Sequence, residues 1–299
     1  MANRTNSSTR AEFLKQIIGL AAASSIASAA SRNPRLLIVV AHPDDEYMFA
    51  ATTDRLVREL GWTADQVVIT NGEAGFRYSS LAESVYGTRL ADETDGRAHL
   101  PAIRREEVLR AGKILGVRKH FFLDQKDLGF ATVASAAGTA NWNRASIGQF
   151  LFELLSKERY DAVFTLLPTG ETHGHHRAAT ILTLEAVARL SENERPLVFG
   201  ADADPDFDPA AFDGLHGQPL TATLGDKPAI SFDRSASFGY HDALSLSDCR
   251  ELGDRRAQVA EPVSERCGKE PLRTFLAVPS RRGGRECTRG PTATQLLAK

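Results

Sequence analysis

An apolar run passes directly into a cluster of ionisable groups in the stretch Leu36-Leu37-Ile38-Val39-Val40-Ala41-His42-Pro43-Asp44-Asp45-Glu46. The six apolar residues are typical of a strand that is buried on both faces of a sheet. Apolar residues then recur at helical spacing over 47–60, which predicts a helix after the polar turn. A strand, a polar turn and a helix in this order indicate an α/β fold, with the ionisable groups at the carboxyl end of the strand.

The same alternation continues along the chain. Further strands are predicted at 66–70, 120–123, 162–167 and 197–200, and further helices at about 101–117, 145–157 and 178–190. Pro101 suits the first turn of its helix, whereas residues 76–100 are polar and irregular and are expected to form a loop. Strands alternating with helices predict a mostly parallel sheet with right-handed crossovers, a Rossmann-like three-layer sandwich. We expect one such domain over 33–248.

Composition and charge narrow the functional classes. The chain has 299 residues, 42% hydrophobic and 25% charged, which is typical of a globular protein. The net charge is −2, of which residues 1–32 carry +3 and residues 249–299 carry +5, so residues 33–248 carry −10. A domain this acidic repels phosphate backbones, and we therefore expect no nucleic-acid partner.

The N-terminus has the pattern of an export signal over residues 1–30. The 14 uncharged residues 17–30 follow two cations and end in Ala27-Ser28-Ala29, an A-x-A cleavage pattern. They fall short of the about 20 residues that a membrane span requires. Residues 9–15 resemble a twin-arginine signal with Ala11 in place of the second arginine, which leaves the route open between Tat and general secretion. The alternative is a short amphipathic helix of a cytosolic protein.

The C-terminal residues 249–299 have a different composition, with nine arginines and all three cysteines of the chain. The only strand we predict in them is at 272–278, and we expect a poorly packed tail or, alternatively, a peripheral subdomain. Because residues 1–248 contain no cysteine, they hold neither a disulfide nor a thiolate metal site. A metal bound there must use histidines and carboxylates.

Such ligands follow two of the predicted strands. His42 and Asp45 come after the first strand, and His173 and His176 come after the strand at 162–167. A hydrolytic zinc site needs three nitrogen or oxygen ligands and one open position. His42 and Asp45 with one histidine of the second motif would make that set, which leaves Asp44 as a carboxylate to take a proton from the attacking water.

Each motif also has a structural alternative. Asp44 and Asp45 are suited to cap a helix N-terminus, and the histidines around His175 are compatible with a polar loop that faces solvent. The occurrence of both motifs at neighbouring strand ends of one sheet favours the metal site.

With AHPDDE at 41–46 and a late His-x-x-His motif, the chain resembles the PIG-L/LmbE family of zinc-dependent N-acetylglucosamine deacetylases. The resemblance covers about residues 35–200 and extends to the turn Asn71-Gly72-Glu73-Ala74-Gly75 and the spacing Arg104-x-x-Glu107. It implies the LmbE-like deacetylase fold. It also implies one zinc ion per chain, at a type of site that accepts Fe²⁺ or Co²⁺ as well.

The resemblance also implies roles for single residues. The zinc ligands would be His42, Asp45 and His176, the general base would be Asp44, and His173 would polarise the acyl oxygen or protonate the leaving amine.

Two further positions carry open questions. Arg104 would contact substrate, or alternatively form a surface ion pair with Glu106 or Glu107. The family usually has an aspartate where this chain has His175, and that aspartate would orient the catalytic histidine.

The predicted function is therefore an exported metal-dependent hydrolase that removes the N-acetyl group from an N-acetylglucosamine-containing glycoconjugate. This is the reaction of an N-acetylglucosaminylphosphatidylinositol deacetylase. The alternatives are an amidase of the same mechanism acting on another N-acyl group, and a non-catalytic sugar-binding protein. A nucleotide-binding protein is disfavoured because no glycine-rich phosphate loop follows the first strand.

Overall fold

The computed structural model describes residues 32–129, 141–170, 172–202 and 211–223, and the short strands at 237–238, 244–245 and 275–278. Five parallel strands form a sheet in the order β3-β2-β1-β4-β5, and β8 is added antiparallel to β5. The strands of this sheet are β1 (Arg35–Val40), β2 (Thr63–Thr70), β3 (Val117–Gln125), β4 (Ala162–Leu166), β5 (Leu197–Ala201) and β8 (Phe275–Val278). A separate antiparallel pair joins β6 (Ser237–Phe238) to β7 (Leu244–Ser245).

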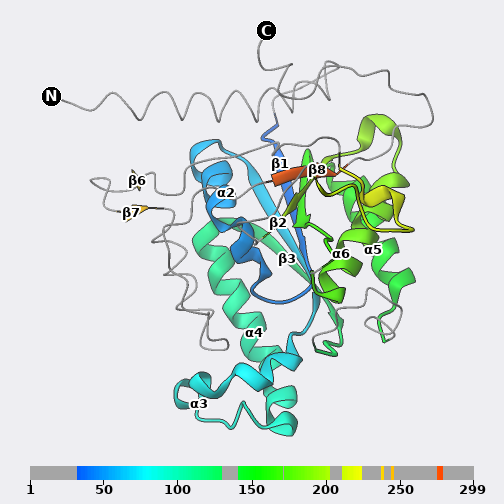
Figure 1. Ribbon diagram of the computed structural model, residues 1–299. Helices are drawn as coiled ribbons and strands as arrows, with labels where there is room; N and C mark the ends of the chain where they lie inside the picture. The colour runs from blue at the N-terminus through cyan, green and yellow to red at the C-terminus, as the bar shows by residue number, and fades with distance from the viewer. Residues whose placement is uncertain are drawn as a thin grey trace, which may run out of the picture.

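Helices cover both faces of the sheet (Figure 1). On one face α5 (Arg144–Glu158) and α6 (Gly174–Ala188) pack against Leu37 and Val39 of β1. On the other face, the segment of η1 (Asp45–Phe49), α2 (Ala50–Asp54) and η2 (Arg55–Glu59) packs with α4 (Glu93–Leu115) against Leu36 and Ile38. The predicted Rossmann-like three-layer sandwich is confirmed. The other helical segments among the described residues are η3 (Glu73–Tyr78), α3 (Ser80–Tyr86), η4 (Glu192–Glu194) and η6 (Pro219–Thr221).

The prediction of an irregular loop over 76–100 is wrong, because the segment is largely helical. The helix α4 begins at Glu93, where the Asp92 side chain accepts hydrogen bonds from two backbone N–H groups of the first turn. Pro101 lies inside this helix instead of starting it. Its ring removes one hydrogen bond of the helix, and the neighbouring Leu100 is fully buried in a cluster with Phe76 and Leu90.

Other boundaries also differ from the predictions. The helix predicted over 47–60 is divided among a 3-10 turn, a short α-helix and a π turn, η1, α2 and η2. The strand β2 begins at Thr63 instead of residue 66. The prediction started too late because Asp65, which is buried in the strand, interrupts the apolar pattern of the sequence. The helix α6 begins at Gly174, four residues before the prediction, because the His173 side chain caps it.

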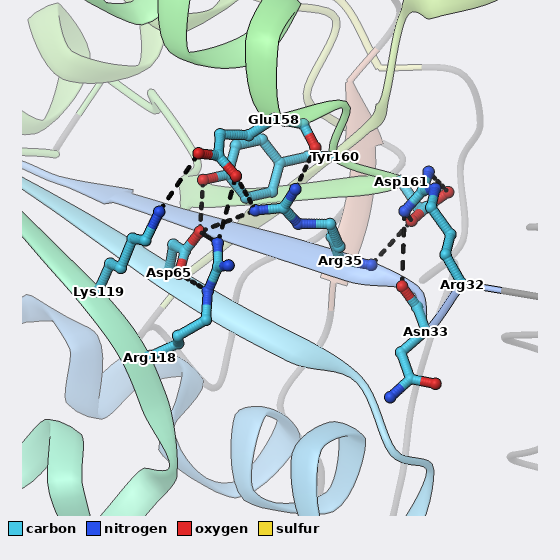
Figure 2. Close-up of polar contacts among 9 residues, drawn as sticks. All are labelled: Arg32, Asn33, Arg35, Asp65, Arg118, Lys119, Glu158, Tyr160 and Asp161. Carbon is cyan, nitrogen blue, oxygen red and sulfur yellow. Dashed lines mark hydrogen bonds and ion pairs between the residues drawn. The ribbon is translucent and has the colours of Figure 1, made fainter.

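An ion-pair network lies at the amino end of the sheet (Figure 2). Asp65 of β2 is fully buried and accepts hydrogen bonds from Arg118 Nε at 2.9 Å and from the Tyr160 hydroxyl at 2.7 Å. Glu158, the last residue of α5, pairs with Arg35 and also with Arg118. This network ties the starts of β1, β2 and β3 to the end of α5.

The proposed export signal lies outside the described residues, as do all three cysteines. Within the tail, β8 falls inside the strand predicted at 272–278, and the rest of residues 249–299 is not described. No helix in the described part of the chain has the length and apolarity to cross a membrane.

Candidate metal centre

The two polar motifs meet at the carboxyl edge of the sheet. β1 and β4 are adjacent and parallel, with Leu36 opposite Ala162 and Ile38 opposite Phe164. The order β3-β2-β1-β4-β5 reverses its direction between these two strands, and ligands of doubly wound sheets bind in the crevice at such a point. The prediction that His42 and the 173–176 motif follow neighbouring strands is confirmed.

His42, Asp45 and His176 form a group of three side chains that could hold a metal ion. His42 Nδ1 lies 3.0 Å from His176 Nε2 and 3.5 Å from Asp45 Oδ2, and His176 Nε2 lies 3.2 Å from Asp45 Oδ1. Ligand atoms bound about 2.0–2.2 Å from one tetrahedral zinc ion lie about 3.4 Å apart. The separations and the nitrogen and oxygen donors therefore fit a zinc ion or a similar divalent cation.

The electrostatics of this group also suit a cation. Burial opposes the charged form of His42, but Asp45, Asp127 and Asp44 outweigh it and raise the pKa of His42 to about 9. Burial likewise disfavours the charged carboxylate of Asp45, but His176 and His42 hold its pKa well below the usual range. The carboxylates thus create a negative potential around nitrogens that would carry lone pairs to a metal.

Asp44 stands beside this group in an unusual backbone conformation. Its φ is 111°, in the left-handed region that a non-glycine residue rarely adopts. Its backbone N–H donates to Glu46 Oε2 at 3.0 Å, and Gln66 Nε2 donates to the same oxygen at 3.3 Å. Glu46 is buried, and burial raises its pKa to about 7. The sequence assigned no role to Glu46, which holds the turn that presents Asp44.

The alternative of helix capping is not what the structure shows. Asp44 occupies the N-cap position of η1, but its side chain makes no capping hydrogen bond. Asp45 Oδ2 instead accepts from the backbone N–H of His42 at 2.8 Å. Both carboxylates therefore belong to the candidate site.

Arg104 lies behind Asp44 instead of on the surface. Its side chain is only 4% exposed, and its guanidinium contacts the Asp44 carboxylate and the Pro43 carbonyl. The predicted turn after β2 makes room for it, since a Cβ at Gly75 would lie 2.8 Å from Arg104 Nη1. The alternative of a surface ion pair is wrong, and direct contact with substrate stays a prediction.

His173 caps α6 and is held in one tautomer. Its Nδ1 accepts from the backbone N–H of His175 at 3.0 Å, so the hydrogen of the neutral ring is on Nε2, 3.2 Å from the Gly129 carbonyl oxygen. Burial and the charge of neighbouring histidines lower the pKa of His173 to about 3. His173 is therefore a neutral hydrogen-bond donor at Nε2, which suits the polarisation of an acyl oxygen.

Besides Glu46, the sequence analysis missed Asp127 and Trp142. Asp127 is buried, with Oδ1 at 3.5 Å from His175 Nδ1 and 4.0 Å from His42 Nε2. The Trp142 ring lies against His175, with ring centroids 5.0 Å apart. Asp127 comes two residues after β3, at the same edge of the sheet. Its position just after a strand could have marked it as a site residue, but the irregular sequence around it contains no motif. The solvent-facing alternative for the second motif is also wrong, because His175 is fully buried.

A doubly wound sheet with a histidine and carboxylate cluster at its switch point defines a Rossmann-like protein with a candidate metal centre. Residues 37–187, about half of the chain, match the family described as PIG-L, GlcNAc-PI de-N-acetylase, and the chain belongs to this family.

The curated relatives are 24% and 28% identical to this chain over the matched residues. A protein of Bacillus cereus named probable N-acetyl-alpha-D-glucosaminyl L-malate deacetylase 2 is 24% identical over 163 residues, which are 54% of this chain and 65% of that protein. The chain thus spans just under two thirds of the length of the curated relatives it matches.

Solved structures share the fold. The N,N'-diacetylchitobiose deacetylase from Pyrococcus horikoshii, complexed with its inhibitor MPG, aligns with a TM-score of 0.50 and 17% identity over 93% of this chain and 95% of that one. GalB, the 4-carboxy-2-hydroxymuconate hydratase from Pseudomonas putida, also aligns at 0.50, with 16% identity over 84% of this chain and 99% of that one. Since a deacetylase and a hydratase share this fold, the reaction must be argued from the site.

Proposed function

We propose that this protein is a metal-dependent hydrolase that removes the N-acetyl group from an N-acetylglucosamine-containing glycoconjugate, with one zinc ion per chain. The observation that carries the proposal is the group of His42, Asp45 and His176, with donor atoms 3.0–3.5 Å apart, flanked by Asp44 and His173. Membership of the PIG-L family and the name of the Bacillus cereus relative support the choice of substrate class.

The roles of the chain's own residues follow from their positions. A bound zinc ion would supply Lewis-acid activation of water and of the acyl oxygen. Asp44 contacts the Arg104 guanidinium and takes the proton of the attacking water at a carboxylate oxygen. Neutral His173 donates from Nε2 to the oxygen that gains negative charge, after it exchanges its contact with the Gly129 carbonyl for one with substrate. The C–N bond then breaks as the amide nitrogen takes the proton held by Asp44, so that acetate and a free amine leave.

Arg104 acts through Asp44 in this proposal. Its buried guanidinium fixes the position of the carboxylate, so a substitution there changes kcat more than KM. A larger change in KM would favour the direct substrate contact predicted from the sequence.

The test is acetate release from a panel of N-acetylglucosamine conjugates, with metal analysis of the same sample. We expect zinc-dependent release of stoichiometric acetate and amine from at least one conjugate. Activity towards other N-acyl groups only would favour the amidase alternative, and sugar binding with no acetate release would favour the non-catalytic one.

We further propose that the protein is exported from a bacterial cell, on the basis of the signal pattern in residues 1–30. Fractionation of cells that express the full chain, with a variant lacking residues 1–30 as control, tests this. We expect the full chain outside the cytoplasm, and retention of both forms in the cytoplasm would contradict export.

A further inference from the structure

We propose that His175 is the positioning residue of the metal ligand His42, with His175 Nδ1 accepting the ring hydrogen of His42 Nε2. The inference rests on the metal site of the proposed function and adds a residue whose role the family pattern does not supply, since an aspartate usually stands at position 175.

The two ring nitrogens of His42 face opposite directions. Nδ1 faces the other candidate ligands, at 3.0 Å from His176 Nε2, whereas Nε2 lies 3.0 Å from His175 Nδ1. If Nδ1 gives its lone pair to a metal, the hydrogen of the neutral ring must be on Nε2. It then needs an acceptor, because metal-binding histidines almost always donate their second N–H to a partner that orients the ring. His175 Nδ1 is at hydrogen-bond distance for this task.

The surroundings of His175 fix its ring for this contact. The side chain is fully buried, and the Trp142 ring lies against it with centroids 5.0 Å apart and planes at 32°. Trp142 Nε1 donates to the Lys126 carbonyl at 3.0 Å, next to Asp127, whose carboxylate is 3.5 Å from His175 Nδ1. The Trp142 ring limits the rotation of the His175 ring, and the Asp127 carboxylate, which has no hydrogen to donate, does not compete with His42 as the donor to His175 Nδ1.

His173 is oriented by the backbone of His175 and not by its ring. The backbone N–H of His175, not its side chain, donates to His173 Nδ1. The usual task of an aspartate at position 175, to orient the catalytic histidine, is therefore served here by the first turn of α6. The His175 ring is directed to the metal ligand instead.

A second reading of the same residues is a separate metal site, because His42, His173 and His175 also bring ligand atoms within 4.8 Å of one another. That site would use His42 Nε2 as a ligand. It would also require a nitrogen of His173, whose Nδ1 accepts from His175 and whose Nε2 faces Gly129. The geometry therefore favours His175 as a hydrogen-bond partner of His42.

The experiment compares zinc affinity between two matched variants, measured by chelator competition on metal-free protein. His175→Asn places Oδ1 near the position of Nδ1 and keeps an acceptor, whereas His175→Leu fills similar space without one. We expect His175→Leu to bind zinc about 10–100-fold more weakly than the wild type, and His175→Asn to stay within a few-fold. Thermal unfolding of the metal-free forms checks that both variants fold.

A measurement on the wild type keeps the inference testable if the variants do not fold. Nitrogen-15 NMR of the zinc-loaded protein should show His42 with zinc at Nδ1 and the hydrogen on Nε2. Zinc at Nε2, an unchanged affinity in His175→Leu, or two zinc ions of which His175→Leu loses one would overturn the inference. A wild-type chain that binds no zinc would instead overturn the proposed metal site, and this inference with it.

Discussion

Charged and ionisable groups gather at both ends of the sheet, but they are paired differently at the two ends. At the amino end, opposite charges face one another, with Asp65 and Glu158 in contact with Arg35 and Arg118 (Figure 2). At the carboxyl end, nitrogens face nitrogens, since His42 lies 3.0 Å from His176 on one side and 3.0 Å from His175 on the other.

This difference separates stability from function. At the amino end, the protein itself satisfies each charge, and such a network stabilises the fold without a ligand. At the carboxyl end, several lone pairs and carboxylates converge on one place, an arrangement that a cation stabilises. The comparison therefore predicts that substitutions at one end change stability and those at the other change metal content and activity.

The largest expected effect is the loss of metal from the carboxyl end. His176→Ala and His42→Ala each remove one of three candidate ligands, so the loss of zinc affinity should exceed the about 10–100-fold typical of an outer-shell residue. Metal content per chain measures this, with Asp65→Asn as the control that should keep its metal. Full metal content in both histidine variants would contradict a metal site at the carboxyl end of the sheet.

The second largest expected effect is a loss of activity without a loss of metal, which would distinguish the general base from the metal ligands. Asp44→Ala should keep its zinc yet lose about 10²–10⁴-fold in kcat, the usual contribution of a positioned base. Steady-state kinetics on the metal-analysed variant test this. Near-normal turnover would assign Asp44 a purely structural role in its turn.

At the amino end, Asp65→Ala should destabilise the fold by about 3 kcal/mol, because it removes a buried charge that Arg118 and Tyr160 contact. The value lies at the lower end for buried pairs, since the Arg118 side chain is 39% exposed and water can hydrate it. Urea unfolding of metal-free protein measures the change. Metal bound per folded chain should not change, and a loss of metal would show that the two ends are coupled.

Low pH should decrease the stability of the fold, because Glu158 at the amino end of the sheet becomes protonated. Hydrogen bonding to Arg35 is the largest cause that lowers the pKa of Glu158 to about 2, below the about 4.3 of an unfolded glutamate. The unfolded chain therefore binds the proton first, and the stability from this group is present above pH about 4.3 and lost towards pH 2. Urea unfolding across this range should show a smaller acid dependence in Glu158→Gln than in the wild type. Identical profiles would contradict the role of Glu158.

The smallest expected effect is that of His175→Asp. His175→Asp introduces the carboxylate that the family usually has, and Asp keeps an acceptor near His42, so turnover should be unchanged or improved. Kinetics with zinc analysis test this substitution. A folded, zinc-loaded but inactive His175→Asp enzyme would show that the imidazole has a role of its own.

The alternation of strands and helices, and the meeting of the two motifs at one edge of the sheet, could be predicted from the sequence. Those conclusions depend on local patterns, namely the apolar run before His42 and the spacing of His173 and His176. Such patterns can be recognised without knowing how distant segments pack. Predictions from local patterns were wrong where side-chain packing or ion pairing outweighs the secondary-structure propensity of a residue. Pro101 lies inside α4 because the surrounding core is buried, and β2 begins before residue 66 because Arg118 pairs with the buried Asp65.

The residues that support the candidate site could not be predicted from the sequence, because they come together only in the folded chain. Asp127 and Trp142 come from an irregular connection, and no pattern in the sequence marks them as neighbours of His175. Arg104 lies 60 residues from Asp44 along the chain, and its burial against that carboxylate depends on the glycines of the turn after β2. The candidate ligands could be proposed from the sequence because each motif is contiguous in it. The residues that orient them were not, because contacts between distant segments exist only once the sheet and its helices have packed.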